Sequence, residues 1–72
     1  MTNDYSEKIL KDLGNQLREA REKARLTQAE VADKAGINVS YYAKIERGEI
    51  NTSIEKLHSI AKVLKIKSLN VS

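Results

Sequence analysis

Residues 27–48 read TQAEVADKAGINVSYYAKIERG, and this stretch decides the fold. Thr27 can cap a helix while Glu30, three residues later, reaches back to the backbone of Thr27, which is the capping-box pattern. Gly36 then ends that helix, because glycine adopts a left-handed conformation without steric cost, and Asn38 caps the next one. The pattern predicts two short helices, at about residues 28–35 and 39–47, joined by a tight turn.

The whole chain has 72 residues, enough for one small domain near the lower limit at which a single core suffices. It has no cysteine and one histidine, so disulfides, thiolate metal sites and His-rich clusters are excluded. No apolar run approaches the roughly 18 residues needed to span a bilayer, and the polar N-terminus is unlike a secretory signal. We therefore expect a cytoplasmic protein with a flexible tail over residues 1–6 and a single domain over residues 7–72.

The charge and composition of the chain favour a helical protein with an anionic partner. Thirteen Lys and Arg against ten Asp and Glu give a net charge of +3, which favours a polyanion. That signal is weak, because many soluble domains are equally basic. With no proline, 32% charged residues and no sustained alternation of apolar and polar residues, the chain is predicted to be all-α, a compact bundle of four to five short helices.

Two further helices are predicted to flank the central stretch, one over about residues 7–24 and one beginning after a cap at Thr52 or Ser53. In both, apolar residues recur at spacings of three and four and form a core-facing stripe. The stripe residues are Leu10, Leu13, Leu17, Ala20 and Ala24 in the first helix, and Ile54, Leu57, Ile60, Ala61 and Leu64 in the last. Gly14, at the edge of the first stripe, predicts the close approach of another helix.

Two charged residues fall on inward faces. Arg21 lies on the apolar stripe of the first helix, and projection of the 39–47 helix places Glu46 inward beside Tyr42 and Ile45. Because burial of a lone charge is costly, we predict that Arg21 and Glu46 form a structural ion pair. The polar side chains predicted to point outward are Gln28, Ser40, Lys44 and Arg47.

The C-terminal part of the chain carries more apolar surface than so small a monomer normally leaves open. Val63 projects off the last stripe, and Ile66, Leu69 and Val71 follow it. These four residues form a candidate dimer surface. The alternative is that the segment folds back over the core as a short fifth helix.

Gln28, Ala32 and Gly36, spaced four apart, and the run Ile45-Glu46-Arg47-Gly48 resemble the helix-turn-helix family of phage repressors and Cro proteins. Within that family, the resemblance is greatest to the stand-alone controller proteins of restriction-modification systems, and it covers about residues 13–66. It implies a lambda repressor-like DNA-binding domain that regulates transcription as a homodimer on a pseudo-palindromic operator. The implied partner is double-stranded DNA, with no cofactor, small-molecule ligand or membrane.

The family places the second helix of its motif in the major groove, and the resemblance implies a role for each matching residue. The implied base-reading residues are Val39, Ser40, Tyr41 and Lys44. The implied phosphate contacts are Gln28, Arg47 and Asn51. Arg21 and Glu46 also match a structural pair of the family. Tyr42 stands where the family usually carries Ile or Val, so its ring is expected to pack while its hydroxyl reaches water or a phosphate.

Two other classes of function were compared with this one. An enzyme is not expected, because the sequence has no acid and base pair in a pocket context, no metal ligand set and no phosphate-binding glycine loop. The lone His58 is interpreted as an ordinary boundary residue. An antitoxin of the same fold, which neutralises a toxin and represses its own operon, is the alternative. It would bind a protein partner away from the 39–47 helix, whereas a controller would form a homodimer and need only DNA.

Overall fold

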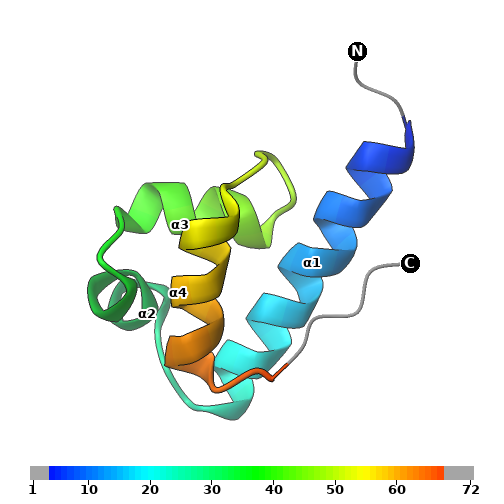
Figure 1. Cartoon of the computed structure of the whole chain (residues 1–72). Coiled ribbons are helices and arrows are strands. Elements are labelled where there is room, and N and C mark those ends of the chain that lie inside the picture. Colours follow the sequence, from blue (N-terminus) through cyan, green and yellow to red (C-terminus); the bar gives the residue numbers. More distant parts are fainter. Residues whose placement is uncertain (1–3, 68–72) are drawn as a thin grey trace.

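The computed structural model describes residues 4–67, and over that range the chain forms four α-helices (Figure 1). They are α1 (Asp4–Lys23), α2 (Gln28–Ala35), α3 (Val39–Glu46) and α4 (Ile54–Leu64). The predicted all-α fold is confirmed. Helix α1 begins three residues before its predicted start, and α3 ends one residue early because Arg47 is its C-cap. None of the described helices is long and apolar enough to cross a membrane.

The predicted capping signals surround α2 and α3. Thr27 Oγ1 accepts a hydrogen bond from the backbone N–H of Glu30 at 3.0 Å, and Glu30 Oε1 accepts one from the backbone N–H of Thr27 at 2.8 Å. Gly36 follows α2 with a φ of 74°, and Asn38 Oδ1 accepts from the backbone N–H of Ser40 at 2.8 Å. The capping box, the glycine turn and the second cap are therefore confirmed.

All four helices end in the same hydrogen-bond arrangement, the Schellman motif. A residue in the left-handed conformation donates its N–H to the carbonyl three residues back, and the next residue donates to the carbonyl five back. The left-handed residues are Arg25, Gly36, Gly48 and Lys65. The sequence predicts only the two glycine ends, because arginine and lysine carry no local signal for this conformation.

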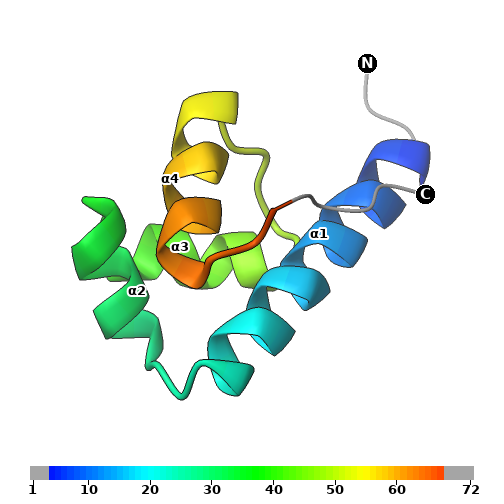
Figure 2. The same cartoon turned by 60° about the horizontal axis from the view of Figure 1, so that its bottom comes forward.

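Helices α3 and α4 lie between α1 and α2, each of which packs on both of them (Figure 2). The first turns of α1 extend beyond the other three helices (Figure 1). The buried apolar core consists of Leu17, Val31, Ala32, Tyr42, Ile45, Ile60 and Leu64. Two residues of the predicted stripes are instead exposed. Ala24 lies past the end of α1, and Ile54, which is 79% exposed, is the first residue of α4, outside the part that packs.

Gly14 determines how closely α1 approaches α3. A Cβ atom at this position would meet the backbone carbonyl oxygens of Glu46 and Ile45, the latter at 2.7 Å. Any side chain here would push the two helices apart, so the predicted close approach is confirmed. The contact also fixes the middle of α1 beside the C-terminal end of α3.

Candidate nucleic-acid interface

Helix α3 has one buried face and one exposed face. The residues on its buried face, as predicted, are Tyr42, Ile45 and Glu46. Val39, Ser40 and Lys44 are exposed on the other side. The apolar side chain of Val39 matches a thymine methyl, and the ammonium group of Lys44 matches the acceptor atoms of guanine. The hydroxyl of Ser40 can bond to a donor or an acceptor on a base edge. None of the three is among the described residues that form the core or pack against it.

The predicted ion pair joins α1 to α3. Arg21 Nε donates to Glu46 Oε2 at 2.7 Å and Arg21 Nη2 donates to Glu46 Oε1 at 3.2 Å. The Arg21 and Glu46 side chains are only 14% and 3% exposed, respectively. Burial by itself would raise the pKa of Glu46, but hydrogen bonds from Arg21 and Gln28 outweigh it and hold that pKa below its usual value. Both partners are therefore charged at neutral pH.

Gln28 lies differently from its prediction. Its side chain is half-buried, and Nε2 donates to Glu46 Oε1 at 2.9 Å instead of pointing outward. The reason is that a buried carboxylate has about four acceptor sites, and Arg21 alone does not fill them. Only one of the two amide N–H atoms of Gln28 is then left for a phosphate.

The two tyrosines of α3 both pack within the domain. The Tyr41 hydroxyl donates to Thr52 Oγ1 at 3.2 Å, and its half-buried ring packs against the core, so this residue ties α3 to the segment before α4. Tyr42 is fully buried between the helices, and burial raises the pKa of its hydroxyl. The prediction that its ring packs is confirmed, whereas the hydroxyl, expected to reach water or a phosphate, is buried with the ring in the core.

The other two predicted phosphate contacts are exposed. Arg47 makes two hydrogen bonds to Glu49, from Nε to Oε2 at 2.8 Å and from Nη2 to Oε1 at 3.1 Å. Sequence reasoning missed this pairing, although an acidic residue two positions after Arg47 was a signal for it. Asn51 is exposed in the segment between α3 and α4.

A polar hollow of about 420 Å³ lies where α1, the start of α2 and the end of α3 meet. Gln28 and Arg47 line it, together with the Arg21–Glu46 pair. Its remaining wall consists of three α1 residues that the sequence reasoning did not single out, Lys11, Asn15 and Arg18. The structure thus brings two of the three predicted phosphate contacts to one hollow, whereas Asn51 is not among the residues that line it.

The candidate dimer surface lies only partly within the described residues. Val63 and Ile66 are half-buried and pack against the core of their own chain. Ile66 follows the left-handed Lys65, a position whose apolar side chain commonly contacts the preceding helix. Leu69 and Val71 lie outside the described residues, and so does any fifth helix beyond residue 67.

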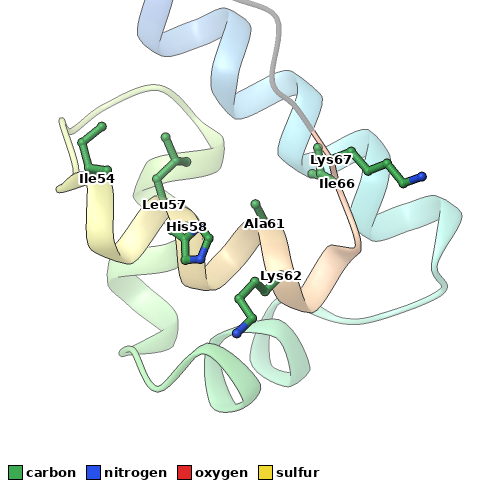
Figure 3. A pocket seen from close by; sticks show the side chains of 7 residues that line it. All are labelled: Ile54, Leu57, His58, Ala61, Lys62, Ile66 and Lys67. Atoms are coloured by element: carbon green, nitrogen blue, oxygen red, sulfur yellow. The ribbon is translucent and has the colours of Figure 1, made fainter.

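Another apolar surface, which includes Ile66, lies along α4. A shallow hollow of about 270 Å³ runs along α4 toward the chain segment that follows it (Figure 3). Its apolar residues are Ile54, Leu57, Ala61 and Ile66. The basic or titratable residues around it are His58, Lys62 and Lys67. This hollow was not predicted, because the periodicity of the sequence placed the apolar residues of α4 on a stripe that faces the core.

Two short helices, a tight glycine turn and an exposed face on the second helix define a helix-turn-helix domain, the class that places its second helix in the major groove. The chain belongs to the helix-turn-helix family, whose model matches residues 17–70. The family resemblance predicted from the sequence is therefore confirmed.

Two known proteins are similar to this chain. The immunity repressor protein of Bacillus phage phi105 is 36% identical over 55 residues, which are 76% of this chain and 38% of the repressor. The chain thus spans well under half of the repressor's length. The crystal structure of the restriction-modification controller protein C.AhdI from Aeromonas hydrophila matches with a TM-score of 0.78 at 34% identity. That match covers 81% of this chain and 88% of the controller protein.

Proposed function

We propose that this protein is a sequence-specific regulator of transcription that inserts α3 into the major groove of double-stranded DNA. The observation that carries the proposal is the exposed face of α3, on a helix whose other face is fully buried. A helix of ordinary diameter fits the major groove, where each base pair presents a distinct donor and acceptor pattern. The repressor and controller names of the two relatives support a role in regulation.

The base-reading residues in this proposal are Val39, Ser40 and Lys44. Lys44 donates to guanine O6 and N7, Ser40 donates to or accepts from a base edge, and Val39 contacts a thymine methyl. Tyr41, predicted to read bases as well, takes a positioning role because its hydroxyl is bonded to Thr52. The phosphate contacts are Gln28, Arg47 and Asn51, which set the register without reading sequence.

We also propose that two copies act together as a symmetric homodimer. Three side chains on one helix distinguish only a few base pairs, which is too little to select one site among on the order of 10⁶ competitors. A second copy doubles the sequence that is read. The expected operator is pseudo-palindromic, with half-sites about one helical turn of DNA apart. Sedimentation of the protein with and without operator DNA measures the stoichiometry.

A gel-shift experiment tests the proposed function. Purified protein is titrated onto duplex DNA from upstream of its own coding sequence and onto a shuffled duplex of equal length, at about physiological salt. We expect the upstream duplex to bind at least about 10³-fold more tightly. Equal binding to the two duplexes would contradict sequence-specific regulation.

Lys44→Ala is the sharper prediction for α3. Because Lys44 reads one base pair in this proposal, the variant should lose discrimination at one position by about 1 to 3 kcal/mol and leave the other positions unchanged. Binding to a set of single-substitution operators measures the effect. Lys34→Ala, which removes the same charge from an exposed position on α2, is the control. A loss of affinity spread evenly over all operators would reassign Lys44 to the DNA backbone.

A further inference from the structure

The polar hollow between α1 and the end of α3 carries a surplus of positive charge. Glu46, the acidic residue that lines it, is already neutralised by Arg21. The other charged residues on its walls are Lys11, Arg18 and Arg47. Within residues 7–67, neither the side chain of Lys11 nor that of Arg18 makes a hydrogen bond or an ion pair. Neither residue is thus in direct contact with a carboxylate, and cations placed in this way on the wall of a hollow attract an anion from solution.

Close backbone contacts hold this basic wall in place. Gly14 lets α1 lie directly against the backbone at the end of α3, as described above. One turn earlier, a Cβ atom on Gly48 would lie 2.8 Å from Cα of Lys11. The part of α1 that carries Lys11, Asn15 and Arg18 is therefore fixed against the turn that follows Arg47. Because this backbone is fixed before a ligand arrives, only the exposed side chains of Lys11 and Arg18 must be ordered on binding.

Arg47, on the wall of the hollow, is paired with the carboxylate of Glu49. Glu49 accepts both hydrogen bonds from Arg47, which lower the pKa of Glu49, and the positive charges of Lys44 and Lys11 act in the same direction. The Arg47 and Glu49 side chains are 54% and 50% exposed, respectively, and ion pairs this open to water are weakly held. An incoming anion can therefore replace the Glu49 carboxylate on Arg47.

We infer that this hollow binds a phosphate group of the DNA backbone, held by Lys11 and Arg18 of α1 together with Arg47 and the remaining amide N–H of Gln28. The choice of DNA as the source rests on the proposed function. With α3 in the major groove, the strand that borders the groove passes the end of that helix, where Arg47 lies beside α1. The first helix, outside the two-helix motif, then becomes part of the DNA interface.

A charge-removal experiment tests this inference. The double variant Lys11→Gln/Arg18→Gln is compared with Lys34→Gln/Lys62→Gln, which removes two exposed lysines from a separate hollow between α2 and α4. Affinity for a short random-sequence duplex is measured by fluorescence anisotropy over a range of salt concentrations. We expect the first variant to reduce the slope of log K against log[salt] by up to about 1, because one phosphate is bound, with little change in the second. Equal slopes for the two variants would overturn the DNA contact.

A second measurement separates bound DNA from free phosphate as the occupant. Inorganic phosphate is titrated onto the wild-type protein while the side-chain Nε–H signals of Arg18 and Arg47 are followed by NMR. Saturable shifts with an unchanged DNA slope would overturn the inference in favour of a free-anion site. A reduced slope supports it, and the shifts then report whether free phosphate competes.

Failure of the inference is distinguishable from failure of the proposed function. If the wild-type protein prefers its operator but the two double variants behave alike, regulation stands and the α1 contact fails. If the slope falls selectively but no operator is preferred, the phosphate site stands and sequence-specific regulation fails. If the protein binds no duplex at all, both the regulator and the DNA contact are overturned.

Discussion

Glu46 joins three helices through its two carboxylate oxygens. It belongs to α3, and it accepts hydrogen bonds from Arg21 of α1 and Gln28 of α2. The last turn of the proposed recognition helix is therefore held by the rest of the bundle. Arg21 is anchored further by a hydrogen bond from Nη1 to the carbonyl of Leu26 at 2.9 Å.

Glu46→Ala should lower the free energy of unfolding by about 3 to 5 kcal/mol, because Arg21 is left nearly buried without its partner. Urea denaturation measures this loss, and Glu19→Ala, at an exposed position of α1, is the control. Arg21→Met/Glu46→Leu, which removes both charges, should cost much less. A melting temperature for Glu46→Ala equal to that of the wild type would show that the pair does not stabilise the fold.

The same pair predicts how stability depends on pH. The pKa of Glu46 is lower in the folded chain than its usual value of about 4.3, so the unfolded chain binds its proton more readily. The contribution of the pair is therefore complete above that value and is lost as the pH falls through the lower folded-state pKa. In Arg21→Met/Glu46→Leu the unfolding free energy should decline less steeply over this acidic range.

Gln28 and Tyr41 show which features of the site the sequence does not predict. Projection placed Arg21 and Glu46 on inward faces, because the positions of charges on a helix follow from its period alone. It could not place the ends of long side chains. Gln28 turned toward Glu46 and Tyr41 turned toward Thr52, and in both cases the partner comes from a different element. Such contacts depend on packing between elements, which the period of one helix does not contain.

At the scale of elements, some helix ends have a local signal in the sequence and others do not. The sequence predicted caps at Thr27, Gly36 and Asn38, because each residue type has a local physical preference for that position. For the last helix it left Thr52 and Ser53 as alternatives, and the structure uses Ser53. Arg25 and Lys65 gave no such signal, yet both adopt the left-handed conformation, with φ of 61° and 58°. A residue with a side chain disfavours the left-handed conformation, so tertiary packing must offset the strain at these two positions.

Lys65→Gly should therefore stabilise the protein, by about 1 kcal/mol, because glycine adopts a positive φ without steric strain. Thermal denaturation measures the rise. Lys62→Gly, three residues earlier in the body of α4, is the matched control and should destabilise by about the same amount. If both variants were destabilised alike, the conformation of Lys65 would not be strained.

At the scale of the whole molecule, placement of charge matters more than its total. A net charge of +3 is modest, but Lys11, Arg18 and Arg47 gather at one hollow, and Lys44 is close enough to affect Glu49 beside it. The sequence predicted the total and could not predict this gathering. It depends on the contact of Gly14 with the end of α3, which brings α1 to that side.

The projecting start of α1 has a consequence for hydrogen exchange. The first turns of the helix extend beyond the other three, Glu7 and Lys8 are exposed, and full burial begins only at Gly14 and Leu17. Amides of residues 7–10 should therefore exchange by local fraying at low free energy, while those of Leu17 and Ile45 should exchange only when the whole domain opens. Hydrogen exchange followed by NMR measures both, and equal protection along α1 would contradict it. The part of the protein that unfolds cooperatively should thus exclude the first turns of α1. Fraying should stop next to the turn that carries Lys11.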